Sequence, residues 1–165
     1  MKRILRLLLI PLCLLVGMAA CQHATMAPAS RFVLLDGSIQ SMDELRGKVT
    51  LITFWATSCS TCVAEMPLLA QTQQQYQSRG YHTLAVAMQY DNPVYVKNFA
   101  RSRQLPFAVA IDHDGQLAQN WGPVRATPTS FLVNRRGQIV QRHVGLLDAG
   151  SLHSSIEKLL SETAS

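Results

Sequence analysis

Cysteine is scarce in this sequence, with four residues among 165, and only Cys59 and Cys62 form a Cys-x-x-Cys pair. A structural zinc site takes four ligands at short, regular spacings. No second cysteine pair follows and the histidines are scattered, so a zinc finger or zinc ribbon is disfavoured. The single pair leaves three interpretations open: a redox pair, an inert disulfide and a Cu(I) site.

Charged residues are also few, at 15% of the sequence, and Arg135-Arg136 is only a short basic pair. The formal net charge of +5 falls to about +2 once Lys2, Arg3 and Arg6, which belong to a predicted targeting segment, are left out. No internal repeat or low-complexity tract is present. The composition excludes a nucleic-acid-binding footprint, and 48% hydrophobic residues argue against a disordered chain. The length predicts one domain with a sizeable core.

The amino end lacks an apolar run long enough to span a membrane. Its apolar stretch over residues 7–16 is short and contains Pro11. A basic start before this stretch and the small pair Ala19-Ala20 after it predict a secretory signal over residues 1–20.

The end of this segment, Met18-Ala19-Ala20-Cys21, resembles a bacterial lipobox. The resemblance implies, with plain secretion and an uncleaved membrane anchor as the alternatives, that Cys21 becomes a lipid-modified amino terminus and that Cys13 is removed with the signal. Residues 21–30 would then be a lipid anchor and a flexible tether, and residues 31–165 the folded domain. That domain would retain only Cys59 and Cys62, in an oxidising compartment.

Strands and helices alternate along the domain. Apolar and β-branched runs predict strands over 31–35, 49–55, 82–88, 107–111, 129–133 and 138–143. Capping and glycine signals predict helices over 60–79, 93–104, 116–121 and 148–161, with a short helical turn over 41–47. We expect Asn92 and Asp148 to cap the helices that follow them, and Gly80 to end the helix before it. The order predicts an α/β sandwich with a mixed sheet.

The Cys-x-x-Cys pair lies where the strand over 49–55 is expected to turn into a helix. The amino end of a helix stabilises a thiolate, which lowers a cysteine pKa from about 8.5 towards 3.5–7.5. Cys59 would lie at that end with its sulfur outward, and Cys62 one turn further in. We therefore expect Cys59 to attack and Cys62 to resolve the mixed disulfide. With Ser60-Thr61 between them there is no imidazolium to stabilise the thiolate, so a moderately reducing pair is expected.

Two motifs resemble the thioredoxin superfamily. One runs from Phe54 to Pro67 as Phe-Trp-Ala-Thr-x-Cys-x-x-Cys-x-x-Glu-Met-Pro, and the other runs from Ala126 to Val133 around Thr127-Pro128. From about residue 32 to 160, the chain more closely resembles the membrane-tethered TlpA/ResA-like thiol–disulfide oxidoreductases of bacterial envelopes. The resemblance implies a thioredoxin-like three-layer sandwich with a mixed central sheet, an amino-terminal β extension and an inserted strand–helix unit over 82–104.

The resemblance also implies roles for individual residues. Thr127-Pro128 would be a cis peptide facing the cysteines, and Glu65 would take the Cys62 proton if it is buried. The alternatives are an ordinary trans proline and a solvated helix carboxylate. The implied catalytic residues are Cys59, Cys62 and Glu65, and the implied substrate-binding residues are Trp55, Thr127 and Pro128. For Trp55 the alternative is a packing role in the core.

Three features depart from the family pattern. Ser58 stands where the family usually has Trp, Ser60-Thr61 replaces the commoner proline-containing pairs, and Val63 stands where a basic residue is frequent. These changes should leave the edge around the disulfide more open and polar. They bear on partner choice and reduction potential, and leave the reaction type unchanged.

These observations predict a monomeric, lipid-anchored enzyme of the bacterial envelope with its domain in the periplasm. It would reduce disulfides in partner proteins through Cys59 and Cys62, without a further cofactor, metal or nucleic acid, and a membrane thiol donor would recharge it. The alternatives are a disulfide oxidant or isomerase of the same fold, and a Cu(I)-handling or partner-binding lipoprotein.

Overall fold

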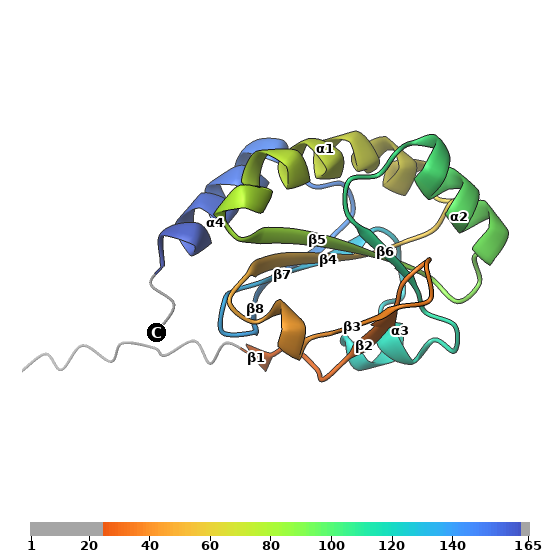
Figure 1. The fold of residues 1–165 in the computed structure, drawn as a ribbon, viewed down its shortest axis with the longest axis horizontal. Coiled ribbons are helices and arrows are strands. Elements are labelled where there is room, and N and C mark those ends of the chain that lie inside the picture. The colour runs from red at the N-terminus through yellow and green to blue at the C-terminus, as the bar shows by residue number, and fades with distance from the viewer. Residues whose placement is uncertain (1–24, 163–165) are drawn as a thin grey trace, which may run out of the picture.

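The computed structural model describes residues 25–162 (Figure 1). The predicted signal over residues 1–20 and the predicted anchor Cys21 lie outside the described residues. The strands are β1 (Thr25–Met26), β2 (Arg31–Val33), β3 (Ile39–Ser41), β4 (Val49–Trp55), β5 (Tyr81–Ala87), β6 (Ala108–Ile111), β7 (Thr129–Val133) and β8 (Gln138–Val144). The helices are α1 (Ser60–Tyr76), α2 (Pro93–Ser102), α3 (Gln116–Asn120) and α4 (Ala149–Ser161), with 3-10 turns at Asp43–Leu45 and Gln77–Arg79.

The central strand β4 belongs to a six-stranded sheet with the order β1-β8-β7-β4-β5-β6. β4, β5 and β6 run parallel, whereas β7 is antiparallel to β4, β8 to β7 and β1 to β8. Every residue of β4 is buried, as expected for an apolar strand covered on both faces. The predicted mixed sheet is confirmed, and its central strand has the predicted bounds.

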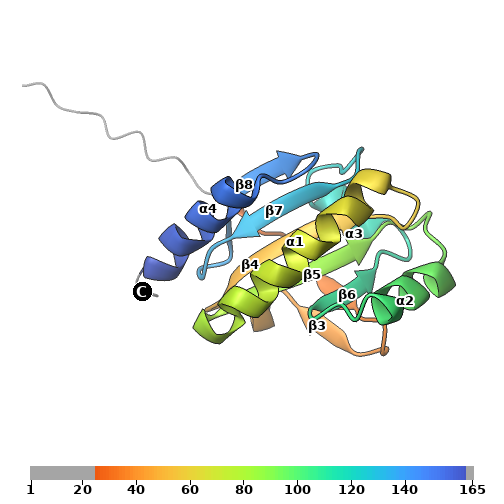
Figure 2. The same cartoon turned by 90° about the horizontal axis from the view of Figure 1, so that it is seen from above.

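The sheet lies between two outer layers. Helices α1, α2 and α4 cover one face, while α3 and the β2–β3 hairpin lie on the other (Figures 1 and 2). Alternation along β4 supplies both cores: Leu51 and Trp55 pack under the three helices, and Ile52 and Phe54 pack with Trp121 on the opposite face. The predicted three-layer sandwich is therefore confirmed. Its strand–helix unit over 82–104 is present as β5 and α2.

Side-chain caps fix the helix ends that the sequence predicted. Asn92 Oδ1 accepts the Val94 N–H at 2.9 Å, and Asp148 Oδ1 accepts the Ser151 N–H at 2.9 Å. α1 continues through Pro67 to Tyr76, and the chain leaves the following 3-10 turn through Gly80, whose φ of +90° suits a residue without Cβ.

The amino-terminal part of the domain differs from the sequence-based expectation. The predicted tether to residue 30 is wrong for residues 25–30: Thr25 pairs with Ile139 of β8, and buried Ser30 accepts a hydrogen bond from Trp121 Nε1 at 2.9 Å. The domain therefore begins before Arg31. Strands β1 and β3 were missed because two or three residues are too few to show an alternating pattern.

Candidate active site

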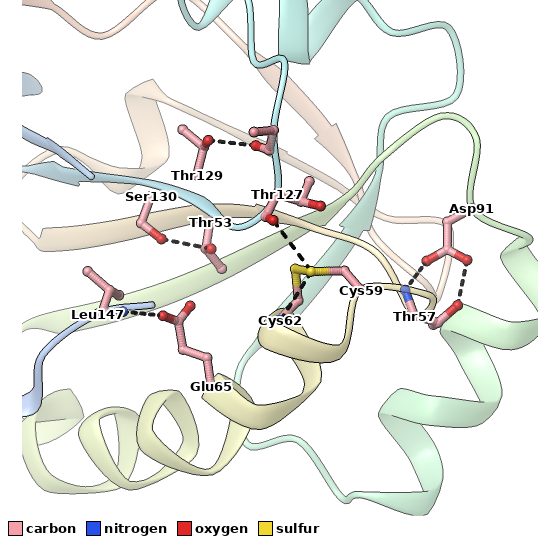
Figure 3. Close-up of a disulfide and its surroundings, with 11 residues drawn as sticks. Thr53, Thr57, Cys59, Cys62, Glu65, Asp91, Thr127, Thr129, Ser130 and Leu147 are labelled. Atoms are coloured by element: carbon pink, nitrogen blue, oxygen red, sulfur yellow. Dashed lines mark hydrogen bonds between the residues drawn. A yellow bond between two sulfur atoms is a disulfide. The ribbon is translucent and has the colours of Figure 1, made fainter. Parts of the chain in front are cut away.

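Cys59 and Cys62 are joined by a disulfide at the amino end of α1 (Figure 3). Cys59 is the N-cap residue of this helix, and its Sγ accepts the Cys62 N–H at 3.1 Å. Cys59 is partly exposed, whereas Cys62 is only 1% exposed. The predicted asymmetry is thus confirmed, because a partner can reach the sulfur of Cys59 and not that of Cys62.

The loop before β7 forms a wall beside the disulfide. The Thr127–Pro128 peptide is cis, as predicted, and the Thr127 carbonyl oxygen lies 3.5 Å from Cys59 Sγ. Pro128 is buried and Thr127 is partly exposed, so the backbone of Thr127 lies at the surface next to the reactive sulfur. The Gly145 N–H donates to the Pro128 carbonyl at 2.9 Å and holds this loop against the end of β8.

Glu65 is buried beside the disulfide, with 2% of its surface exposed. It lies one helical turn after Cys62, and its Oε1 accepts the Leu147 N–H at 2.7 Å. Burial raises the pKa of Glu65, while the Leu147 hydrogen bond and the positive charge of protonated His143 oppose the rise. The alternative of a solvated helix carboxylate is therefore excluded.

Asp91 is a second buried carboxylate at the site, and the sequence did not identify it. Its Oδ2 accepts the Thr57 N–H at 2.5 Å, and its Oδ1 accepts the Thr57 hydroxyl at 2.6 Å (Figure 3). The residue lies in the segment between β5 and α2, far from Thr57 in sequence. It directly precedes Asn92, the predicted cap of the next helix, and nothing local to it indicates a contact with the cysteine turn.

Trp55 does not occupy the surface position that a substrate-binding role requires. Its exposed fraction is 0%, and its ring packs against Phe99 of α2 with centroids 5.2 Å apart. The implied contact of Trp55 with a substrate is therefore wrong and its alternative, a packing role, is confirmed, because α2 covers this end of β4. The residues exposed around the disulfide are instead Ser58, Ser60 and Thr61, which depart from the family pattern.

The part of the chain that the structure describes contains no candidate metal site, since no three His, Cys, Asp or Glu side chains lie close enough there to hold an ion. Three histidines have other neighbours: His82 lies 3.3 Å from Gln40, His153 lies 3.1 Å from Thr72, and His143 lies 2.9 Å from the Leu146 carbonyl. Between residues 25 and 162, no helix is both long and apolar enough to cross a bilayer.

Comparison with known proteins agrees with this geometry. The Redoxin family model matches residues 22–160. The thiol-disulfide oxidoreductase ResA of Bacillus subtilis (strain 168) is 32% identical over 127 residues, which cover 76% of this chain and 70% of the relative. ResA of Bacillus thuringiensis subsp. konkukian is 30% identical over 133 residues, which cover 79% and 76%.

Solved structures share the fold. A candidate thioredoxin from Neisseria meningitidis superposes with a TM-score of 0.79 at 35% identity, covering 85% of this chain and 93% of that one. A thiol:disulfide interchange protein of the thioredoxin family from Chlorobium tepidum gives 0.77 at 26% identity, covering 84% and 97%. With the partly exposed Cys59 at a helix start and the cis-proline wall beside it, these matches show that the chain belongs to the Redoxin family, as a TlpA/ResA-like thiol–disulfide oxidoreductase of the thioredoxin superfamily.

Proposed function

We propose that this oxidoreductase is a lipid-anchored reductase of the bacterial envelope that transfers two electrons from Cys59 and Cys62 to disulfides in partner proteins. The observation that carries the proposal is the arrangement of one accessible sulfur, one shielded sulfur and a buried carboxylate with a raised pKa. This arrangement separates the attacking thiol from the resolving thiol and supplies a proton acceptor for the second step.

The reaction begins from the dithiol form. The Cys59 thiolate attacks one sulfur of the partner's disulfide, so that a Cys59–partner bond forms, the partner's S–S bond breaks and its other sulfur leaves as a thiolate. Cys62 then loses its proton and attacks Cys59 Sγ. The Cys59–Cys62 disulfide forms, the partner's remaining sulfur leaves as a thiolate, and both partner thiolates take up protons. The partner is reduced by two electrons and this protein is oxidised by two.

Glu65 is the proposed acceptor of the Cys62 proton. A carboxylate with a raised pKa takes a proton more readily near neutral pH than an ordinary one. A cavity of about 180 Å³ is lined in part by Ser130, His143 and Leu147, and Leu147 is the residue whose N–H binds Glu65. Water in this cavity would carry the proton onward to solvent.

The backbone wall at Thr127 is the proposed partner-binding element. Its position 3.5 Å from Cys59 Sγ supports pairing with an extended segment of the partner while the mixed disulfide exists. We propose that the cysteine pair is the only redox group of the protein, that the protein acts as a monomer, and that a membrane thiol donor reduces the Cys59–Cys62 disulfide after each cycle.

The proposed anchor is Cys21, behind the predicted signal over residues 1–20. Thr25 of β1 pairs with Ile139, near the start of β8, whereas Val144 at the far end of β8 pairs with Thr129 beside the active site. Ile139 and Val144 are five residues apart along β8, which corresponds to about 17 Å of strand. An anchor just before β1 would therefore leave the disulfide on the part of the domain that points away from the membrane.

A trapping experiment tests the proposal. In cells, Cys62→Ser should accumulate mixed disulfides between Cys59 and envelope proteins, because the resolving thiol is gone, and Cys59→Ser is the matched control that should trap none. Adding Cys21→Ser should release the trapped complexes from the membrane fraction. Absence of trapped partners, or a reduction potential of the purified domain in the range of strong oxidants, would overturn the proposed direction.

A further inference from the structure

The carboxylate of Asp91 joins two parts of the molecule at the reactive turn. Both of its oxygens bind Thr57, through the backbone N–H at 2.5 Å and through the hydroxyl at 2.6 Å, and only Ser58 lies between Thr57 and Cys59. The side chain is 8% exposed, so these contacts are shielded from water. The turn that carries the attacking sulfur is thus held by a residue from the segment between β5 and α2.

The backbone around Asp91 is fixed as well. Its own N–H donates to the Met88 carbonyl at 2.9 Å, and the Met88 N–H donates to the Trp55 carbonyl at 2.9 Å. The next residue, Asn92, caps α2. Asp91 therefore lies between the amino ends of α1 and α2, which both favour a negative charge.

We propose that Asp91 is a positioning residue that holds the turn before Cys59 and that its negative charge disfavours the Cys59 thiolate, which makes the dithiol a stronger reductant. This inference deepens the proposed function, on which its meaning for partner reduction rests. When the thiolate is stabilised, the dithiol form is stabilised too and gives up its electrons less readily. A nearby negative charge destabilises the thiolate, so it makes the dithiol a stronger reductant.

The electrostatic argument depends on where the charges lie. α1 directs its positive end at Cys59 and stabilises a thiolate there. Asp91 places a negative charge next to the same turn, in a shielded position where the effective dielectric constant is lower than in water. The elements around the disulfide also carry Glu65, His143 and Arg125, and a substitution at Asp91 leaves these three residues in place.

Three variants separate charge from contact. Asp91→Asn keeps the size of the side chain and removes its charge, Asp91→Glu keeps the charge, and Thr57→Val removes the hydroxyl contact while the carboxylate remains. Thermal unfolding of the oxidised proteins checks their folding. If Asp91→Asn does not fold, Asp91→Ser, which also removes the charge, takes its place.

The first measurement is the pH dependence of alkylation at Cys59 in the reduced protein, and the second is the equilibrium of the cysteine pair with a glutathione buffer. We expect Asp91→Asn to lower the pH midpoint of alkylation and to shift the equilibrium towards the dithiol by roughly threefold or more. Thr57→Val and Asp91→Glu should not lower the midpoint.

The proposal is overturned if Asp91→Asn leaves both quantities unchanged, or if Thr57→Val or Asp91→Glu lowers the midpoint as much as Asp91→Asn does. Alkylation requires neither a partner protein nor a membrane donor. A failure here is therefore distinguishable from a failure of the proposed function, which would show as the absence of trapped partners.

Discussion

Two buried carboxylates flank the disulfide from opposite sides (Figure 3), and they are bound differently. Asp91 accepts two hydrogen bonds, both from Thr57, and each of its oxygens has a donor. Glu65 accepts one hydrogen bond, from the Leu147 N–H, and is more deeply buried. Each carboxylate holds a loop next to the cysteines, so both contribute to the geometry of the site.

The two carboxylates also differ in the roles that we propose for them. Burial with a single donor raises the pKa of Glu65, which supports its proposed role as acceptor of the Cys62 proton. Asp91 has both oxygens engaged by Thr57 and lies at two helix amino ends, which supports its proposed role in positioning the turn. One carboxylate is therefore assigned to proton transfer and the other to positioning, although both are buried acidic residues next to the same disulfide.

The largest expected effect is on the rate of the second thiol step, which should respond to a change at Glu65 and not to a change at Asp91. Glu65→Gln keeps an oxygen for the Leu147 N–H and loses the proton acceptor. We expect it to slow the second thiol step about 100-fold, the range for loss of a general base, whereas Asp91→Asn should leave that step nearly unchanged. An aromatic disulfide with a coloured thiol product measures this, because Cys59 releases the first equivalent and Cys62 the second.

The first release is the internal control for this experiment, since it depends on Cys59 and should survive in Glu65→Gln. Equal slowing of both releases would indicate a general distortion of the site and contradict the role of Glu65 in proton transfer. Equal slowing of the second release by both variants would remove the distinction between the two carboxylates.

A smaller effect is expected in the pH dependence of stability. The folded chain binds the Glu65 proton more tightly than the unfolded chain, because burial raises its pKa above 4.5. At a pH between the pKa of Glu65 in the unfolded chain and its pKa in the folded chain, the folded state holds more protons. The free energy of unfolding therefore falls as the pH rises through this interval. Glu65→Gln lacks this fall. From pH 4 to 7 the stability of Glu65→Gln relative to the wild type should therefore increase, and by more the further the folded-state pKa of Glu65 lies above its unfolded value.

Urea unfolding of the oxidised proteins at both pH values measures this difference. Burial lowers the pKa of His82 to about 4, so its contribution runs the other way: stability is lost as the pH falls from 6.5 through 4. His82 is present in both proteins, and its contribution cancels in the comparison. A relative stability that does not change with pH would show that Glu65 does not carry a raised pKa.

The side of the site that holds Glu65 was predictable from the sequence, and the side that holds Asp91 was not. The Cys59 cap, the buried strand before it and the glycine end after Arg79 are local patterns, read from neighbouring residues. The position of Glu65 one turn after Cys62 follows from helical spacing. The family resemblance supplied the remaining link to the Thr127–Pro128 wall.

The contacts that were missed join distant segments. Asp91 and Thr57 are 34 residues apart, and no periodicity of either segment indicates their pairing. The sequence left Trp55 open between packing and substrate contact, and its burial against Phe99 of α2 is a long-range contact that only the three-dimensional packing shows. Strand β1 forms because β8 offers it an edge. In each case the sequence specifies the element, and a partner elsewhere in the chain specifies its environment.

The smallest expected effect concerns the charge that faces Glu65. The His143 ring lies 2.9 Å from the Leu146 carbonyl, and its protonated form holds the pKa of Glu65 below the value that burial alone would give. His143→Gln keeps a donor for the carbonyl and removes the charge. We expect the pKa of Glu65 to rise further, and the acidic midpoint in the pH dependence of the second thiol release to move to higher pH. His153→Gln, at the Thr72 contact, is the matched control and should change neither release. An unchanged or lower midpoint in His143→Gln would contradict the electrostatic coupling between His143 and Glu65.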